Sequence, residues 1–221
     1  MKICLIGCEG YIGSYLFKNM KYEMTGIDKK NKSGKTIVKT EYERDFLEKY
    51  DVIIYLGGMS SRNMEEKDME KNMEVVKIGE LLSKKQILIY ASTSAIYEGI
   101  ENAKENDEIK EELMDNYTRS MINRENGLKK LTNTNTIGLR IATVVGISPK
   151  QRSDRVHIEM IKTALFTNRI HVRNRNCMRA IISLEDILKA FNSILDKYKM
   201  QQSNINKVHE IFHEIYNLGS R

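Results

Sequence analysis

Three glycines near the start of the chain have the spacing of a turn that can bind a diphosphate. Gly7, Gly10 and Gly13 form the pattern G-x-x-G-x-x-G directly after a short apolar run at residues 2–6. Between a strand and a helix, the first glycine permits a tight turn, the second lets backbone N–H groups approach a pyrophosphate, and the third allows close helix packing. The N-terminus of the helix adds unpaired N–H donors and a partial positive charge. The pattern predicts a dinucleotide-binding turn.

A carboxylate follows at the end of the next predicted strand, residues 22–27. Asp28 could accept hydrogen bonds from both hydroxyls of an adenosine ribose, and its charge would repel a 2′-phosphate, which favours NAD over NADP. Lys29 and Lys30 come next, and this basic pair could instead serve a 2′-phosphate. The alternative for the glycines is a tight loop without a ligand, which leaves Asp28 without a role.

The elements that would position these residues alternate between strands and helices. We expect a Rossmann-type α/β fold, a doubly wound parallel sheet with helices on both faces. The predicted strands are residues 2–6, 22–27, 36–39, 51–56, 86–90 and 136–141, and the predicted helices are residues 11–20, 60–83 and 117–131.

The pattern changes after Gly146. There we expect a helix at 154–167, short strands at 169–172 and 179–182, a helix at 183–199, a loop at 201–207 and a strand at 215–218. Ser183 and Asp186 have the spacing of a capping arrangement at the start of the second helix. We therefore divide the chain into a dinucleotide-binding domain, residues 1–148, and a small, truncated substrate-binding portion, residues 149–221, interleaved with the last elements of the sheet.

The composition is that of a folded domain with a basic surface. The chain has 221 residues, of which 41% are hydrophobic, and a formal net charge of +6. No apolar run approaches the ~18 residues of a membrane helix, and the apolar opening is too short for a signal peptide, so we expect a cytoplasmic protein. The basic residues are spread out without interleaved aromatics, which disfavours nucleic acid and suits a phosphorylated small molecule.

Neither the cysteines nor the histidines form a metal-binding pattern. Cys4 and Cys8 have no second pair, and the third cysteine is Cys177, so reduced packing thiols are expected. His209 and His213 lie four apart without further ligands at a familiar spacing. No metal site is predicted.

Further motifs, in order along almost the whole chain, resemble the NAD-dependent epimerase/dehydratase family, the extended short-chain dehydrogenases/reductases that act on nucleotide sugars. One example is Asp51–Ser60 (D-V-I-I-Y-L-G-G-M-S), which is similar to D-V-I-H-L-A-A-x-x-S with Tyr55 in place of His. The other matching segments are Gly7–Gly13, Arg44-Asp45-Phe46, Asn72, Tyr90–Glu98, Arg140–Gly146, Arg179–Asp186 and Tyr216–Gly219.

The resemblance implies specific roles for residues at the matching positions. It places the catalytic hydroxyl at Thr93 and the catalytic phenol at Tyr117, the adenine contact at Asp45, and the substrate contacts at Thr93, Ser94 and Arg179, the last on the substrate diphosphate. The cofactor-binding set that it implies is Gly7, Gly10, Tyr11, Ile12, Gly13, Asp28, Asp45, Phe46, Leu56, Gly57, Gly58, Ser60 and Tyr117. It also implies a homodimer through helices 60–83 and 117–131.

One departure from the family pattern concerns the chemistry directly. The family has Tyr-x-x-x-Lys, whose lysine holds the nicotinamide ribose and lowers the tyrosine pKa from its usual value near ~10. Here Tyr117 is followed four residues later by Met121, although Ser120 and Glu125 fit the pattern. Either Arg124, a further turn along, reaches the ribose, or Met121 is ordinary core and the site is not catalytic.

These residues leave two main functions open. Ser94-Ala95 replace the Asp-Glu pair of family dehydratases, which disfavours sugar 4,6-dehydration and leaves epimerisation or carbonyl reduction of a nucleotide sugar. The alternative is a catalytically impaired NAD(H)-binding sensor or subunit. The chain ends soon after Tyr216–Gly219, so we expect a substrate site that is open, completed by another subunit or suited to a smaller ligand. Arg152 and Arg155 are either anion contacts there or, more simply, surface charges.

Overall fold

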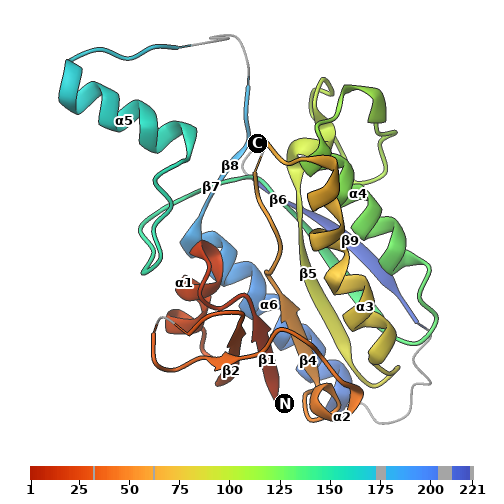
Figure 1. Cartoon of the computed structure of the whole chain (residues 1–221). Helices are drawn as coiled ribbons and strands as arrows, with labels where there is room; N and C mark the ends of the chain where they lie inside the picture. Colours follow the sequence, from red (N-terminus) through yellow and green to blue (C-terminus); the bar gives the residue numbers. More distant parts are fainter. Residues whose placement is uncertain (32, 62, 173–177, 204–210, 220–221) are drawn as a thin grey trace.

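The molecule is built around one parallel sheet of seven strands in the order β3-β2-β1-β4-β5-β6-β9 (Figure 1). The computed structural model describes residues 1–31, 33–61, 63–172, 178–203 and 211–219. Strands β1 to β3 are added toward one edge of the sheet, and the strands from β4 onward are added toward the other edge. In open parallel sheets, the switch point between the two directions, here between β1 and β4, forms the ligand-binding crevice. The α/β class and the doubly wound sheet expected from the sequence are confirmed.

The elements of the sheet and its cover alternate as the sequence predicts. The strands are β1 (Ile3–Ile6), β2 (Met24–Asp28), β3 (Ile37–Val38), β4 (Val52–Tyr55), β5 (Ile87–Thr93), β6 (Asn135–Ile141) and β9 (His213–Leu218). The helices are α1 (Tyr11–Asn19), α2 (Arg44–Leu47), α3 (Glu74–Leu81), α4 (Asn116–Lys129), α5 (Val156–Thr167) and α6 (Leu184–Ser203), with 3-10 turns η1 (Glu66–Met73), η2 (Ser94–Tyr97) and η3 (Glu111–Leu113).

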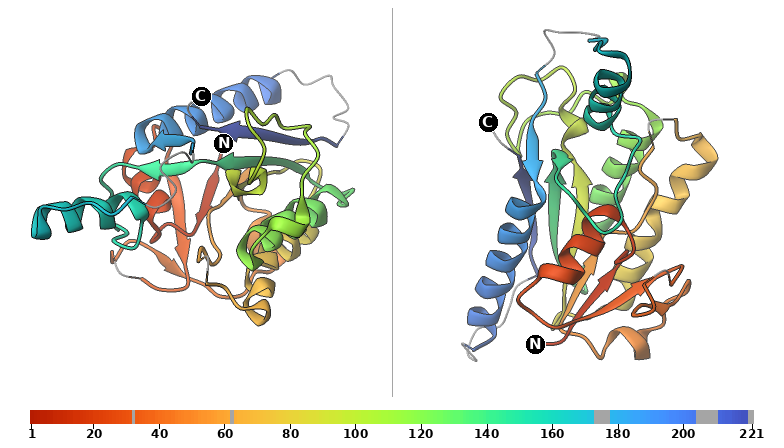
Figure 2. Two further views of the ribbon diagram at one scale, coloured as in Figure 1. Left: turned by 90° about the horizontal axis from the view of Figure 1, so that it is seen from above. Right: turned by 90° about the vertical axis from the view of Figure 1, so that its left-hand side faces the viewer.

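Two apolar layers hold the helices on the sheet, because successive strand side chains point to opposite faces. On one face Leu5 and Ile54 pack with Leu16 of α1 and Phe191 of α6. On the other face α3 and α4 pack over a layer that includes Ile53. Figure 2 shows α1 and α6 on one side of the strands and α3 on the other.

Several element boundaries differ from the sequence predictions. The predicted helix 60–83 begins only at Glu66 and starts as the 3-10 helix η1, and residues 169–172 form no strand. β5 continues beyond Tyr90 to Thr93, because its small polar residues pair with β6. The predicted loop 201–207 begins inside α6, and its remainder from 204 lies outside the described residues. The capping of α6 is confirmed: the Asp186 amide donates to Ser183 Oγ at 3.0 Å.

The part of the chain after Gly146 contributes both to the sheet and to a separate extension. β7 (Thr143–Val145) and β8 (Ile181–Ser183) form their own parallel pair, whereas α5 projects from the body and buries none of its residues (Figure 1). The division at residue 148 stays a prediction, since α6 and β9 follow it and complete the main layers. No helix within the described ranges combines the length and apolar character needed to span a membrane, and the cytoplasmic location stays a prediction.

Candidate functional site

The glycine-rich turn requires its first and third glycines for steric reasons. Gly7 has φ +90°, and a Cβ there would lie 2.8 Å from the Gly57 amide nitrogen. A Cβ on Gly13 would lie 2.0 Å from the Gly7 carbonyl oxygen. The turn between β1 and α1 is therefore pressed against the loop after β4, which brings two halves of the candidate site together.

The second glycine is less crowded than the other two and fits a bound anion. A Cβ on Gly10 would have only one neighbour within 4 Å, the Gly7 carbonyl oxygen at 3.2 Å. Gly10 is the N-cap of α1, and neither a side-chain cap nor an acidic residue occupies the first turn. The N–H groups at this helix start are thus left for an anion such as a pyrophosphate, and the turn fits a dinucleotide.

Asp28 stands at the end of β2, beside the turn. Its Oδ2 accepts the Glu9 N–H at 3.0 Å and its Oδ1 accepts the Lys29 N–H at 2.8 Å. The Lys29 ammonium lies 3.0 Å from Glu74 Oε1. Lys29 is therefore engaged in an ion pair with α3, which weakens its case as a ligand of a 2′-phosphate.

The structure does not bring Asp45 and Phe46 to the glycine-rich turn. Both lie on α2, where the Leu47 carbonyl accepts a hydrogen bond from Gln86 at 2.9 Å, just before β5 begins. This is the opposite end of the strands, near the N-terminus of the chain (Figure 1).

Tyr42, which sequence reasoning missed, is the residue of this segment that approaches Asp28. Burial raises its pKa, and the nearby Asp28 and Cys8 act in the same direction. The only available signal was its place soon after the third strand, and a one-turn helix is too short for a periodic pattern to locate.

The loop after β4 is held by one buried asparagine. Asn72 accepts the Met59 N–H at 2.7 Å and donates from Nδ2 to the Met59 carbonyl at 3.1 Å and to Ser120 Oγ at 2.8 Å. Ser120 Oγ donates to the Tyr117 carbonyl at 2.6 Å. This chain of hydrogen bonds fixes the loop containing Leu56 and Ser60 relative to the start of α4.

Arg124 is buried and holds the same loop through hydrogen bonds to backbone carbonyls. It is 1% exposed and donates to the carbonyls of Asn72 at 2.9 Å, Ala91 at 2.8 Å and Gly57 at 3.4 Å. Gly58 has φ +117°, which favours glycine, and a Cβ there would lie 2.5 Å from Asn72 Oδ1 and 2.7 Å from Arg124 Nη2. The expectation that Arg124 reaches the cofactor ribose is not supported, because backbone oxygens take up its donors.

Thr93 and Tyr117 lie at the ends of elements that pack together. Thr93 is the last residue of β5, and its Oγ1 accepts the Ala95 N–H at 3.2 Å, which places Ser94 at the start of η2. Tyr117 is in the first turn of α4, whose N-cap Asp115 accepts the Thr118 N–H at 2.8 Å. Because α4 contacts both β5 and η2, the hydroxyl and the phenol belong to one region at the carboxyl edge of the sheet.

A buried ion pair fixes α4 on the sheet behind this region. Arg140 donates to Glu125 from Nε at 3.1 Å and from Nη2 at 2.8 Å, and Ser92 Oγ donates to the same carboxylate at 2.5 Å. Both charged side chains are almost completely buried, 5% and 6% exposed. The pair links β5, β6 and α4, and so sets the position of Tyr117 relative to Thr93.

Met121 is 5% exposed and belongs to the packing of α4. It brings no charge to Tyr117, one helical turn earlier.

Two partly exposed arginines contact the loop after β4. Arg152 Nη2 donates to the Ser60 carbonyl at 3.1 Å, and Arg155 Nη2 donates to Ser60 Oγ at 3.2 Å. Burial and the neighbouring Arg152 lower the pKa of Arg155, while Asp154 and Tyr117 oppose this decrease. Tyr117 therefore lies within electrostatic range of Arg152 and Arg155, as it does of Arg124. Both Arg152 and Arg155 are partly exposed, so whether they bind an anion or are surface charges stays open.

Two other predictions concern residues away from these contacts. Arg179 is exposed just before β8, and among the described residues no group of three or more His, Cys, Asp or Glu side chains could hold a metal. Cys177 and His209 lie outside the described residues.

Comparison with known proteins gives a consistent picture. The NAD-dependent epimerase/dehydratase family model matches residues 3–219, whereas no curated protein matches. A UDP-glucuronic acid 4-epimerase from Bacillus cereus solved with NAD is 21% identical, with TM-score 0.74 over 100% of this chain and 79% of that one. A UDP-N-acetylglucosamine 4-epimerase from Methanobrevibacter ruminantium M1 is 17% identical, with TM-score 0.73 over 99% and 76%.

An NAD-dependent NDP-hexosamine 5,6-dehydratase of tunicamycin biosynthesis is 16% identical, with TM-score 0.75 over 99% of this chain and 75% of that one. At these identities the neighbours show the fold alone, while the family model covers nearly every residue. The chain therefore belongs to the NAD-dependent epimerase/dehydratase family.

Proposed function

We propose that the protein is an NAD-dependent epimerase or reductase of a nucleotide sugar, in which Tyr117 moves the proton and Thr93 positions the reacting oxygen. The observation that carries the proposal is the shared location of the open helix start at Gly10, the Thr93 hydroxyl and the Tyr117 phenol at the carboxyl edge of one sheet. Ligands of open α/β sheets bind at that edge.

The cofactor would be held mainly by backbone and by one carboxylate. The N–H groups of Tyr11, Ile12 and Gly13 would bind the pyrophosphate, Asp28 the adenosine ribose, and the loop from Leu56 to Ser60 the nicotinamide half. When bound, NAD⁺ supplies the hydride acceptor that this chemistry needs.

Proton transfer by Tyr117 must proceed without a lysine at position 121. The guanidinium groups of Arg152 and Arg155, held on Ser60, place positive charge near Tyr117. Thr93 keeps its hydroxyl proton for the substrate, since its oxygen only accepts a bond from Ala95. Acid–base catalysis contributes ~10²–10⁴-fold, so we expect slow turnover relative to an enzyme with the lysine.

The proposed substrate is a nucleotide diphosphate sugar. Structural neighbours include enzymes named for UDP-glucuronic acid and UDP-N-acetylglucosamine, and the net charge of +6 suits an anionic substrate. Arg179 would contact the diphosphate and Ser94 the sugar. Because Ser94-Ala95 lack the carboxylates that eliminate water, epimerisation or reduction is favoured over dehydration.

The direct test is turnover of a panel of UDP-, GDP- and dTDP-sugars, followed by sugar composition and by NADH absorbance. Tyr117→Phe and Thr93→Val should each lower the rate at least tenfold, while Tyr216→Phe, a change of a half-exposed tyrosine on β9, should leave it unchanged. Undiminished turnover in Tyr117→Phe would show that the catalytic assignment is wrong.

One observation favours a second function, binding of NAD(H) without catalysis. Met121 is buried and supplies neither a charge nor a hydrogen-bond donor at the position of the family's lysine. If the wild type shows no turnover and Met121→Lys turns over a sugar nucleotide, the natural chain is a sensor or a subunit.

The homodimer through residues 60–83 and 117–131 is part of the proposal. η1, α3 and α4 pack against one another on one face of the sheet, so their outer surfaces form one continuous layer. Native mass spectrometry of the purified protein would measure the subunit count and any retained dinucleotide together, and a monomer at micromolar concentration would contradict the dimer.

A further inference from the structure

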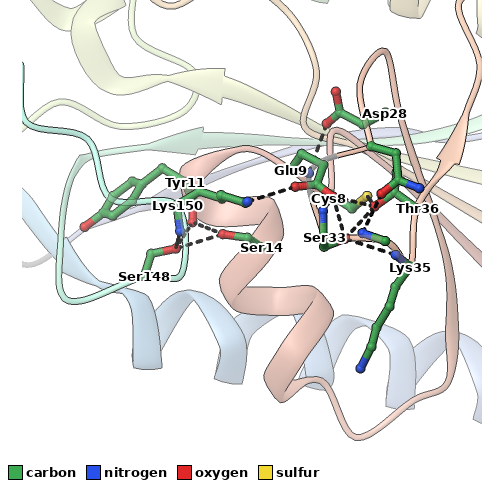
Figure 3. Close-up of polar contacts among 12 residues, drawn as sticks. Cys8, Glu9, Tyr11, Ser14, Asp28, Ser33, Lys35, Thr36, Ser148 and Lys150 are labelled. Carbon is green, nitrogen blue, oxygen red and sulfur yellow. Dashed lines mark hydrogen bonds and ion pairs between the residues drawn. The ribbon is translucent and has the colours of Figure 1, made fainter.

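The glycine-rich turn contains a buried carboxylate that its diphosphate-binding role does not require. The Glu9 side chain is only 4% exposed. Its Oε1 accepts hydrogen bonds from the Ser33 N–H at 3.0 Å, Ser33 Oγ at 2.6 Å and Thr36 Oγ1 at 2.7 Å. Its Oε2 lies 3.3 Å from Lys150 Nζ (Figure 3).

This carboxylate is ionised at neutral pH. The hydrogen bonds from Ser33 and Thr36 and the nearby Lys150 outweigh the effect of burial and lower the pKa of Glu9 to about 2. A buried carboxylate with this many donors is held in one position. Glu9 therefore contributes a fixed negative charge to the turn.

Glu9 lies next to the carboxylate that is proposed to bind the ribose. Its own N–H donates to Asp28 Oδ2 at 3.0 Å, and Figure 3 shows the two side chains on neighbouring parts of the same network. Burial raises the pKa of the Cys8 thiol, and the nearby negative charges of Asp28 and Glu9 raise it further. The carboxylates of Asp28 and Glu9 thus both lie within electrostatic range of Cys8, near the end of β2.

Two of the lysines near this point form ion pairs. Lys150 faces Glu9, and Lys29 faces Glu74 at 3.0 Å. A 2′-phosphate on the adenosine ribose would approach two carboxylates without a free ammonium from either lysine. Coulomb repulsion between like charges several ångströms apart remains substantial near a protein surface.

We propose that Glu9 is a cofactor-selecting residue, which acts with Asp28 to exclude a 2′-phosphorylated dinucleotide and so commits this site to NAD. The inference rests on the proposed function, because it assumes that the turn binds a dinucleotide with its ribose at Asp28. It adds a second charge, from the turn itself, to the discrimination made by Asp28.

The variant Glu9→Gln tests the effect of the negative charge while the side chain keeps its shape. A glutamine has the same length, and its carbonyl oxygen can accept the three bonds from Ser33 and Thr36. Glu9→Gln thus removes the charge with little change in packing. Lys150→Met has the opposite electrostatic effect, because it leaves the Glu9 charge unpaired.

The experiment is isothermal titration of NAD⁺ and NADP⁺ into the purified chain, its two variants and the control Glu159→Gln on α5. We expect the wild type to prefer NAD⁺. Glu9→Gln should strengthen NADP⁺ binding on the order of tenfold and change NAD⁺ binding by less than about threefold. Lys150→Met should weaken NADP⁺ binding several-fold, and Glu159→Gln should change neither affinity.

The outcomes separate this inference from the proposed function. If the NAD⁺/NADP⁺ affinity ratio is the same in the wild type, Glu9→Gln and Lys150→Met, Glu9 does not select the cofactor, although NAD⁺ binding would still support the function. If the wild type binds neither dinucleotide at millimolar concentration, the proposed function is wrong and this inference falls with it. If Glu9→Gln does not fold, the NAD⁺/NADP⁺ affinity ratio of Lys150→Met alone decides whether Glu9 selects the cofactor.

Discussion

Alanine substitutions at Gly10 and Gly13 should separate cofactor binding from folding stability. Gly10 has φ −82° and ψ 175°, a conformation that alanine adopts without strain. Alanine at this position raises the unfolding free energy by ~0.4–1 kcal/mol, because the unfolded chain is less flexible. It lowers the unfolding free energy by a similar amount, because alanine is a poorer N-cap than glycine. With only one atom within 4 Å of the new Cβ, the net change in unfolding free energy should be close to zero.

Gly13→Ala should behave in the opposite way. Its Cβ would sit 2.0 Å from the Gly7 carbonyl oxygen and 2.9 Å from the Gly7 carbonyl carbon, so α1 must move by about an ångström. Such overpacking costs ~1–3 kcal/mol, and for a chain of this size each kcal/mol lowers the melting temperature by ~2–4 °C. A stability loss is therefore expected before any ligand is added.

Thermal melts with and without NAD⁺ and isothermal titration provide the assay. At 100 times its dissociation constant, a ligand stabilises the native state by ~2.7 kcal/mol. Wild type should show that increase, whereas Gly10→Ala should keep the unliganded melting temperature and lose at least tenfold in NAD⁺ affinity, ~1.4 kcal/mol, because its methyl group lies in front of the α1 N–H groups. If Gly10→Ala binds NAD⁺ like the wild type, the proposed pyrophosphate contact is wrong.

Three further predictions concern the catalytic region, the buried ion pair and acid stability. Met121→Lys should raise sugar-nucleotide turnover by roughly 10²-fold in a steady-state assay, and an unchanged rate would contradict the view that the missing lysine limits proton transfer. Arg140→Met should leave Glu125 buried without its partner and lower the unfolding free energy by ~3–5 kcal/mol in urea melts, whereas a loss under 1 kcal/mol would show that the pair is dispensable. The pKa of Glu9 falls from its ordinary 4.5 to about 2 on folding, so its contribution to stability is complete above the unfolded pKa and is lost as the pH falls toward 2. The stability difference between wild type and Glu9→Gln should accordingly shrink between pH 5 and pH 2, and a constant difference would show that Glu9 is not held as an ion.

The sequence was most informative where local pattern and packing agree. The strand before Gly7, the turn itself and the strand ending at Asp28 are each specified by neighbouring residues, so their places in the sheet could be read from periodicity and glycine spacing. The segment after Ser60 was predicted less well. Its polar first half forms the 3-10 helix η1, whose position depends on Asn72 reaching Met59 and Ser120 from two other segments.

The same distinction applies to the candidate site. Thr93 and Tyr117 were located by motif, and the structure places both at the ends of packed elements. Asp45 and Phe46 were assigned from a short match that lies on a one-turn helix at the other end of the strands. Short acidic segments carry little information about which edge of a sheet they face, and Tyr42 could be found only from its surroundings.

By itself, the sequence determined the fold class, the dinucleotide turn and the absence of a lysine four residues after Tyr117, because each depends on residue types at short spacing. Only the tertiary structure decided what the isolated charges do. It showed that Arg124 is buried and donates to three backbone carbonyls, and it placed Arg152 and Arg155 on Ser60. It also bonded the Glu9 N–H to Asp28 and the Glu9 carboxylate to Ser33 and Thr36. The physical reason is that a charged side chain takes its role from its partners and its burial, and these come from segments far apart in the chain.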